Sequence, residues 1–300
     1  MSPLISIVLP VFNRLDFLRA ALASVHAQTS ENWELVIVDD GSDERTRQFL
    51  ETQTGARTRV VFREHSGVPA AVRNVGIACA RGKYVAFLDS DDQWAPDKLQ
   101  EQLAVMESAP MRRWSYTAVR KISADGRVLD DADFEPWVGY SGYIVEELLR
   151  FKASVAMPTV MADLAFVREL DGFDETMRFA EDYDLWLRMA MRSEVSVISK
   201  PLADVRSHPG RFSEDRVAGL EGWQRLFEKM RALMPTPVLR RLCHQRAGEH
   251  ALLLAAHHAR HRHWASMQRS LLTAVRARAW NPQEWVRVGK AAVSSHCHTR

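Results

Sequence analysis

The sequence has few cysteines and no long apolar run. Its 300 residues include 3 cysteines, Cys79, Cys243 and Cys297, none of them in a CxxC pair. This spacing argues against a disulfide framework and a structural zinc site, and it favours a reducing compartment. No segment approaches the roughly 20 apolar residues that a membrane-spanning helix needs. The N-terminus lacks the basic leader and cleavage site of a signal peptide, so we expect a cytoplasmic protein.

Three nucleotide-binding and catalytic signatures are also missing. The chain has no GxGxxG, which disfavours a nicotinamide cofactor, and no GxxxxGK[ST], which disfavours a P-loop. It has no GxSxG nucleophile elbow either. These absences argue against a nicotinamide cofactor, a P-loop and a nucleophile-elbow serine.

Acidic residues are scarce at the C-terminal end. Residues 231–300 hold 12 Lys and Arg against 2 acids, whereas residues 1–230 hold 28 against 36. Eight of the 11 histidines also follow residue 230. This asymmetry predicts two units with different partners.

The N-terminal part alternates short apolar runs with amphipathic segments. Strands are expected at 4–9, 35–38, 59–62 and 84–88, and helices at 16–26, 43–53, 69–80 and 97–106. Strand–helix repetition with buried β-branched strands predicts a mostly parallel α/β sheet flanked by helices. Functional groups in such sheets collect at the carboxyl ends of strands.

After residue 110 the alternation weakens. We expect a strand at 114–122, a hairpin turn at 125–126, a helix at 181–192 and a strand at 195–199. Beyond Pro209 the pattern is helical, with candidates at 214–233, 238–256 and 261–278, punctuated by Pro235, Pro237 and Asn281-Pro282.

Two acidic clusters follow predicted strands. Asp89 and Asp91 can point into one cleft and suit a hard divalent cation that also binds phosphate oxygens, although acidic turns are common. Asp39 can accept hydrogen bonds from a nucleobase or ribose, and the same segment can equally form a turn with a helix cap.

Two later features are ambiguous when taken alone. Glu181 and Asp182 open a helix, where the helix dipole stabilises acids anyway, so a catalytic base is one of two interpretations. His208 is a ligand candidate only if the cleft already holds a metal.

Taken together, the segments resemble an inverting family 2 glycosyltransferase with the GT-A fold, of the soluble bacterial type. The resemblance covers about residues 4–212. It rests on the order and spacing of the segments 6–13 (SIVLPVFN), 38–42 (VDDGS), 67–76 (GVPAAVRNVG), 87–92 (FLDSDD), 172–175 (GFDE), 181–188 (EDYDLWLR) and 206–208 (RSH).

The resemblance implies a function and a set of site residues. The function is inverting transfer of a sugar from a nucleotide sugar, most plausibly linked to UDP or dTDP, to a hydroxyl of a glycan or lipid-linked saccharide. The cofactor would be a divalent cation, Mn²⁺ or Mg²⁺. The general base would be Asp182, the metal residues Asp91 and His208, the acceptor-binding residue Glu181, and the donor-binding residues Pro10, Val11, Asp39, Arg73, Asn74, Asp89 and Ser90. Asp92 could share the role of Asp89 or Asp91.

The resemblance also sets the expected domains. Residues 1–212 would form the catalytic GT-A domain, with a nucleotide half at about 1–110 and an acceptor half at about 111–212, and residues 213–300 a basic helical extension. For that extension we consider a solvated basic face, a peripheral dock for an anionic membrane at the inner face, and a metal site at His257 and His261. We expect no nucleic-acid binding, because no recognised motif accompanies the basic residues.

Overall fold

The computed structural model describes residues 3–129, 137–210 and 215–277, with residues 282, 283, 285, 286, 288 and 290. Cys297 and much of the predicted basic extension after residue 277 lie outside the described residues. The chain divides into two compact units. The first comprises Met1–Thr176 with Glu181–Pro209, and the second comprises Met177–Ala180 with Gly210–Arg300.

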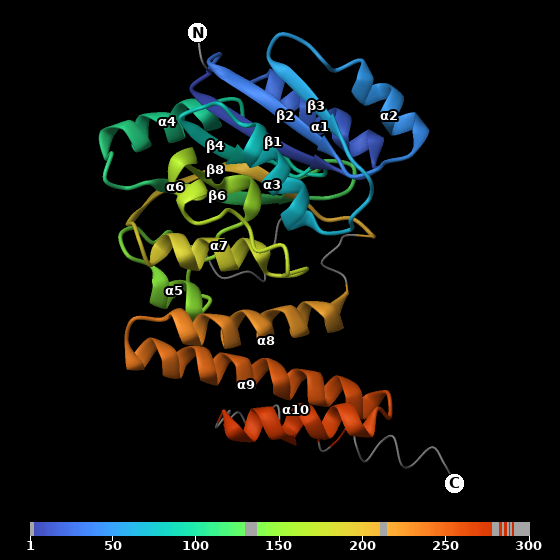
Figure 1. Cartoon of the computed structure of the whole chain (residues 1–300), viewed down its shortest axis with the longest axis vertical. Helices are drawn as coiled ribbons and strands as arrows, with labels where there is room; N and C mark the ends of the chain where they lie inside the picture. Colours follow the sequence, from blue (N-terminus) through green and yellow to red (C-terminus); the bar gives the residue numbers. More distant parts are fainter. Residues whose placement is uncertain are drawn as a thin grey trace. The chain divides into compact units, whose positions relative to one another are not determined.

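The first unit is built on one eight-stranded sheet with the order β3-β2-β1-β4-β7-β6-β8-β5 (Figure 1). The strands are β1 (Ile5–Val11), β2 (Trp33–Asp39), β3 (Thr58–Phe62), β4 (Tyr84–Phe87), β5 (Gln93–Trp94), β6 (Trp114–Ile122), β7 (Met161–Asp163) and β8 (Val195–Arg206).

The sheet is mixed. Strands β3, β2, β1 and β4 run parallel to one another, as do β6 and β8. Strand β7 is antiparallel to β4 and β6, and β5 is antiparallel to β8. The predicted α/β class is confirmed, and the parallel half is the one that the strand–helix alternation indicated.

Helices cover both faces of the parallel half. The helices of the first unit are α1 (Leu15–His26), α2 (Glu44–Glu51), α3 (Pro69–Cys79), α4 (Lys98–Ser108), α5 (Val145–Leu149), α6 (Leu164–Glu169) and α7 (Glu181–Ala190), with a 3₁₀ turn at Met157–Thr159.

Strand β2 shows why its sequence is continuously apolar. Leu35 and Ile37 join a core cluster with residues of α1, whereas Val36 and Val38 pack with Val72 of α3. A strand buried on both faces needs apolar residues at every position. The two layers of helices therefore follow from the strand composition.

The strand predicted at 195–199 is too short. Strand β8 continues to Arg206, through Pro201. Its pairing with β6 shifts register between Thr117 and Ala118, and such an irregularity accommodates a proline. The extension matters because it brings Arg206 and the following His208 beside the end of β4.

The second unit consists, in its described part, of helices α8 (Arg216–Leu233), α9 (Pro237–Arg260) and α10 (Trp264–Arg276). Thr236 caps α9 and Pro237 occupies its first turn, as the proline punctuation suggested. Helix α9 extends beyond the predicted end at 256 to Arg260, and α10 begins at Trp264 rather than 261. Ala251, Leu252 and Ala255 pack with Ala274 of α10.

Candidate active site

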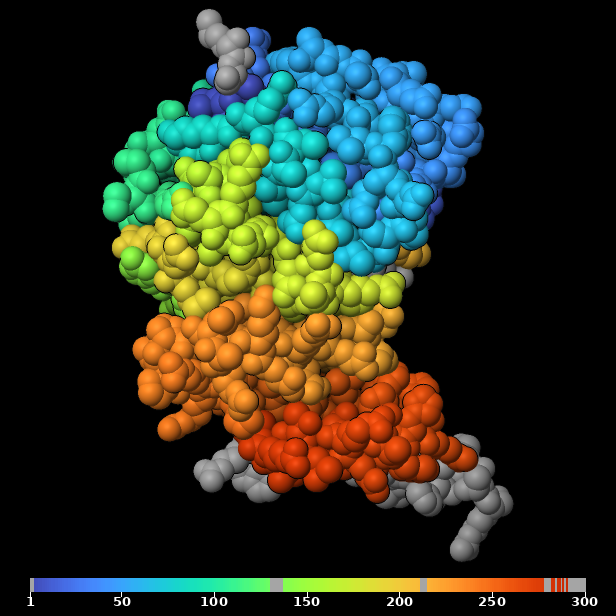
Figure 2. Space-filling view, in the orientation of Figure 1, coloured from blue at the N-terminus to red at the C-terminus, as the bar shows by residue number. Residues whose placement is uncertain are grey.

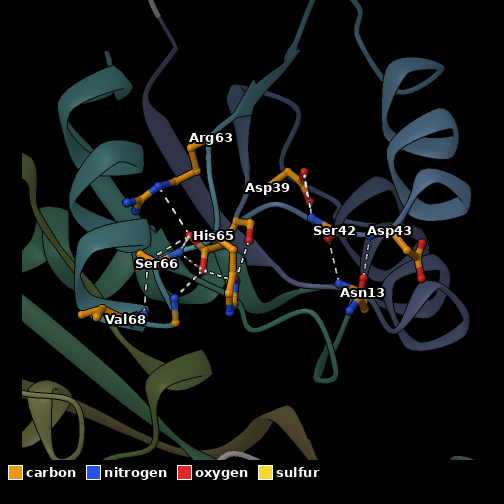
Figure 3. Close-up of polar contacts among 10 residues, drawn as sticks. Asn13, Asp39, Ser42, Asp43, Arg63, His65, Ser66 and Val68 are labelled. Carbon is orange, nitrogen blue, oxygen red and sulfur yellow. Dashed lines mark hydrogen bonds and ion pairs between the residues drawn. The ribbon is translucent and has the colours of Figure 1, made fainter.

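Two adjacent carboxylates at the end of β2 have different surroundings. Asp40 accepts hydrogen bonds from the backbone amides of Ser66 (3.1 Å) and Gly67 (3.0 Å) and from the Ser66 hydroxyl (2.9 Å). Arg63 and His65 contact the same carboxylate at 3.4 and 3.0 Å (Figure 3). Asp40 therefore fixes the loop between β3 and α3, a role that the sequence did not reveal.

Asp39, the predicted base-binding residue, is only 1% exposed. Its carboxylate oxygens accept from the backbone amide of Ser42 at 3.3 Å. Between the two residues the chain turns at Gly41, which has a φ of +76°. A Cβ atom there would lie 2.8 Å from the backbone nitrogen of His65, so this turn requires glycine.

The end of β1 forms the neighbouring wall. Pro10 and Val11 pair in register with Val38 and Asp39, which places all four side by side. Just beyond them the Phe12 ring stacks on the His65 ring, with centroids 4.0 Å apart. Phe12 is 43% exposed, so this aromatic pair presents a face to solvent beside Asp39.

The β1–α1 turn is tied to the β2–α2 turn and is strained. The amide of Asn13 donates to Ser42 Oγ at 2.7 Å, and the amide of Asp43 donates to Asn13 Oδ1 at 2.8 Å (Figure 3). Asn13 and Arg14 both have a φ of 58°. Left-handed backbone is costly for arginine and persists where surrounding contacts enforce it.

Asp91, a predicted metal residue, contacts two cationic or basic groups. Arg14 Nη1 lies 2.9 Å from Asp91 Oδ2, and His208 Nε2 lies 3.0 Å from the same oxygen. The His208 side chain is buried and the Asp91 side chain is mostly buried. The structure therefore brings together the two residues that the sequence assigned to a metal.

The hydrogen bonding of His208 sets its tautomer. Its Nδ1 lies 2.8 Å from the Pro209 carbonyl oxygen, which can only accept, so Nδ1 carries the hydrogen. In neutral imidazole Nε2 then directs a lone pair at the Asp91 carboxylate. Two acceptors in contact need a proton or a cation between them, so this pair fits a divalent metal.

The rest of the acidic motif contacts protein groups. Asp92 is 5% exposed and accepts from the Arg206 amide at 2.9 Å. Arg206 Nε donates to the Asp91 carbonyl at 2.9 Å. Ser90, between Asp89 and Asp91 in the sequence, is buried. Asp92 thus fastens the motif to β8, and within the described residues no group of three or more His, Cys, Asp or Glu side chains is arranged to hold a metal.

Arg73 joins the motif to helix α7. Its Nη2 lies 2.7 Å from Asp89 Oδ1, and its Nη1 lies 2.7 Å from Glu181 Oε1. Asp89 follows β4 by two residues and Glu181 is the first residue of α7, so one guanidinium connects the segment after β4 to α7. Arg73 is 6% exposed, and its Nε is buried with no hydrogen-bond partner.

Asp182, the predicted base, lies next to this bridge. One carboxylate oxygen accepts from the amide of Tyr183 at 2.7 Å. Burial raises the pKa of Asp182, with the Tyr183 hydrogen bond and the charge of Arg73 opposing that rise. Burial also raises the pKa of Glu181 to about 7, against the attraction of Arg73. A carboxylate with a raised pKa is a stronger base than an ordinary one.

Asn74, predicted to hold the nucleotide, contacts the 172–175 segment. Its amide nitrogen donates to the Phe173 carbonyl at 2.8 Å and to Glu175 at 2.9 Å. Its amide oxygen accepts from the Phe173 amide at 2.9 Å. The α3 pair Arg73–Asn74 therefore contacts both the start of α7 and the 172–175 segment.

His257 and His261 of the second unit stack, with ring centroids 4.2 Å apart. Among the residues that the structure describes, the histidines of this unit belong to no group of three or more His, Cys, Asp or Glu side chains that could hold a metal ion. No described helix is both long and apolar enough to cross a membrane.

Comparison with known proteins identifies the domain. Residues 6–126 match the family described as Glycosyl transferase family 2. The chain carries a family 2 glycosyltransferase domain. The segments on which the sequence resemblance rested between residues 6 and 92 fall inside that match, so the predicted family is confirmed.

Two relatives and one solved structure illustrate the likeness. An uncharacterized glycosyltransferase of Rickettsia felis is 35% identical over 207 residues, 69% of this chain and 33% of that protein. The chain thus spans about a third of the length of that relative. UDP-Glc:alpha-D-GlcNAc-diphosphoundecaprenol beta-1,3-glucosyltransferase WfgD of Escherichia coli is 29% identical over 198 residues, 65% of this chain and 73% of that protein.

The solved structure is residues 1–349 of S. aureus TarS in complex with UDP-GlcNAc. It matches with a TM-score of 0.62 and 17% identity, over 92% of this chain and 91% of that one. The match confirms the GT-A fold that the sequence predicted, together with the C-terminal helices.

Proposed function

We propose that the chain transfers a sugar from a nucleotide-sugar donor, linked to UDP or dTDP, to an acceptor hydroxyl on a glycan or lipid-linked saccharide. The transfer inverts the anomeric carbon and uses a divalent cation and an Asp general base. The names of the similar proteins support a UDP-linked donor, because WfgD uses UDP-Glc and TarS was solved with UDP-GlcNAc.

One observation carries this proposal. Arg73 holds Asp89 of the acidic motif and Glu181 at the start of α7 at 2.7 Å each. The bridge brings the donor-side acids and Asp182 into one cluster, as a single displacement requires. Without this bridge, the acidic motif after β4 and the acids at the start of α7 would be two separate acidic turns.

The donor side is assigned to the strand ends. Asp39 would accept from the base, where N3–H of uracil or thymine is a donor, and Pro10 and Val11 would line that pocket with backbone. Asp89, with Ser90 beside it, would reach the ribose. Arg73 and Asn74 support this side from α3 through the protein contacts given above.

Asp91 and His208 would hold the cation, Mn²⁺ or Mg²⁺. Bound there, the cation would neutralise the negative charge that develops on the departing diphosphate. Two protein ligands suffice if the diphosphate oxygens complete the set, which is the usual way that Mg²⁺ binds nucleotides. Arg14 Nη1 also reaches Asp91 Oδ2, at 2.9 Å.

Asp182 would take the proton from the acceptor hydroxyl as that oxygen attacks the anomeric carbon from the opposite face. One displacement inverts the configuration and needs no covalent intermediate. A carboxylate at this position gains basicity from its burial, which raises its pKa. Glu181 would bind the acceptor, and it also contacts Arg73 at 2.7 Å.

Helix α10 supplies a candidate surface for peripheral membrane contact. Leu272 is 56% exposed and Val275 is 59% exposed, and the exposed Arg269 and Arg276 flank them. Apolar and basic side chains on one helix face suit an anionic bilayer. In Figure 2, α10 lies within the red part of the surface.

A thermal-shift screen tests the proposed function. The full chain is heated with UDP, dTDP, GDP, ADP or buffer, with Mn²⁺ or with EDTA. Ligands that bind the folded state raise the melting temperature by mass action. We expect UDP or dTDP to raise it in Mn²⁺ and to do so less in EDTA. No shift with any nucleotide would contradict the proposal.

A further inference from the structure

Arg73 occupies an unusual position for a residue expected to bind the donor. Both terminal nitrogens of its guanidinium already contact protein carboxylates at 2.7 Å, and the residue is 6% exposed. The N–H donors of a guanidinium lie in one plane, so two contacts with carboxylates fix the orientation of the group. The guanidinium therefore has little freedom to turn towards a bound nucleotide.

The two carboxylates come from different parts of the chain. Asp89 lies at the end of β4, and Glu181 begins α7 more than 90 residues later. Arg73 itself lies in α3, whose Gly76 packs so closely on β1 that an added Cβ would be 2.4 Å from Val8. The guanidinium is therefore carried by a helix fixed against the sheet.

The charges at this point make the bridge necessary. Asp89, Glu181 and Asp182 are three acids around one arginine, and burial raises the pKa of Glu181 to about 7. Without a cation, the acids at the start of α7 and at the end of β4 would repel each other. Removing one partner of a buried ion pair leaves the other unsatisfied.

We infer that Arg73 and Glu181 are positioning residues that set the distance between the donor acid Asp89 and the general base Asp182. Arg73 acts on the reaction through these carboxylates, and Glu181 acts by anchoring the first turn of α7. This inference rests on the proposed function, and it assigns to both residues a task other than the predicted contacts with nucleotide and acceptor.

The test uses Arg73→Lys in the full chain. Lysine keeps the charge but offers one nitrogen, so it cannot span both carboxylates as the fork does. The matched control is Arg113→Lys, because Arg113 also bridges two acids, Asp163 at 3.0 Å and Glu169 at 2.8 Å, outside the site. Three quantities are measured: the Kd for UDP with Mn²⁺, and kcat and KM for hydrolysis of UDP-glucose or UDP-GlcNAc.

The expected pattern separates positioning from binding. In Arg73→Lys, kcat should fall about 100-fold, the cost of a misplacement of about 1 Å, while the Kd for UDP stays within about 3-fold. Arg113→Lys should change neither. If the Kd rises in proportion to the fall of kcat, Arg73 binds the donor directly. If kcat is unchanged, the bridge has no role. Either result overturns the inference.

Glu181→Gln gives an independent reading, because hydrolysis uses water as the acceptor. A residue that only binds the saccharide acceptor would leave hydrolysis unchanged, whereas a positioning residue lowers its kcat. Because both residues act through one bridge, the double variant Arg73→Lys/Glu181→Gln should lose no more than the worse single variant. If the fold losses of kcat in the two single variants multiply in the double variant, the two residues have separate roles and the inference is contradicted.

Hydrogen exchange distinguishes this failure from failure of the proposed function. The amides at the start of α7 should exchange faster in Arg73→Lys than in the wild type and Arg113→Lys. If the wild type neither binds UDP nor hydrolyses a UDP-sugar, the proposed function is wrong, whatever exchange shows. If it does both and α7 exchange is unchanged in Arg73→Lys, only the positioning role is wrong.

Discussion

At the scale of single residues, the site depends on which groups share each carboxylate. Asp91 contacts His208 and Arg14, Asp92 accepts from the backbone of β8, and Asp89 contacts Arg73. Three acids within four positions therefore have three different partners. Of the three, only Asp91 contacts an imidazole nitrogen, Nε2 of His208 at 3.0 Å.

Asp91→Asn should remove metal-dependent binding. The amide keeps the volume of the side chain but is a poor ligand, so the affinity for UDP in Mn²⁺ should fall by about 10–100-fold, whereas affinity in EDTA should change little. Calorimetry measures both. The control is Asp204→Asn, an acid paired with Arg120 at 2.7 Å, which should match the wild type. Equal affinity of Asp91→Asn and the wild type in Mn²⁺ would place the metal elsewhere.

The sequence predicted the positions of these acids but not their partners. Parallel strands end at one edge of a sheet, so Asp39, Asp89 and Asp91 could be placed there from the strand pattern alone. The partners come from distant parts of the chain and from local strain. Arg14 reaches Asp91 through a left-handed turn, and Asp40 binds a loop 26 residues later, which no periodicity reveals.

At the scale of elements, two contacts determine how the helices meet the sheet. Helix α3 approaches β1 through a glycine, and helix α4 begins with a completely buried lysine. The helix pattern predicted both helices. It could not predict the close approach at Gly76 or the burial of Lys98, because both depend on neighbours that the sequence pattern does not show.

Gly76→Ala should destabilise the protein. Its new Cβ would lie 2.4 Å from Val8 Cγ1, and overpacking of this kind costs about 1–3 kcal/mol. Gly219, inside α8, has no atom within 4 Å of the corresponding position. Gly219→Ala should therefore gain about 0.5–1 kcal/mol from helix propensity. Urea unfolding of both variants measures the two signs, and destabilisation of both by the same amount would refute the packing explanation.

Lys98 should make the free energy of unfolding depend on pH below the pKa of an unfolded lysine. Its Nζ donates to Gln102 at 2.6 Å and lies 4.1 Å from the centre of the Trp94 ring, and burial lowers its pKa well below the ordinary value. Below the unfolded pKa of about 10.4, the unfolded chain binds the proton that the folded lysine releases. The free energy of unfolding should therefore rise with pH in the range between the folded and the unfolded pKa of Lys98.

Lys98→Met isolates this effect. As pH rises through the range between the folded and the unfolded pKa, the wild type should gain stability relative to the variant by up to about 1.4 kcal/mol per pH unit. Urea unfolding at several pH values measures it. Lys83→Met, which removes an exposed lysine, is the control and should show no such change. A constant difference for Lys98→Met would mean that Lys98 stays protonated in the folded protein.

At the scale of the whole molecule, the charge asymmetry of the sequence coincides with the division into units. Most of the basic excess lies in the helical unit, and the acidic excess lies with the sheet that carries the site. The family match covers only part of the sheet unit, residues 6–126. Substrate and partner assignments therefore depend on experiments with the full chain.

Binding to anionic vesicles tests the proposed role of α10. Leu272→Glu places a negative charge beside Val275 and the flanking arginines. The variant should therefore lose co-sedimentation with phosphatidylglycerol vesicles, while its Kd for UDP stays unchanged. Leu233→Glu is the control, because Leu233 is 49% exposed at the end of α8 in the same unit. Equal binding of both variants, or of the wild type to neutral vesicles, would contradict the proposed surface.

The most direct test of the proposed reaction follows donor hydrolysis by ¹H NMR, in wild type and Asp182→Asn. With an α-linked UDP-sugar and Mn²⁺, the wild type should release the β anomer first, before the free sugar equilibrates. Asp182→Asn keeps the size of the side chain and removes its ability to accept a proton, so turnover should fall by about 10²–10⁴ while the Kd for UDP stays near normal. Release of the α anomer first, or undiminished turnover in Asp182→Asn, would contradict an inverting transfer with Asp182 as the base.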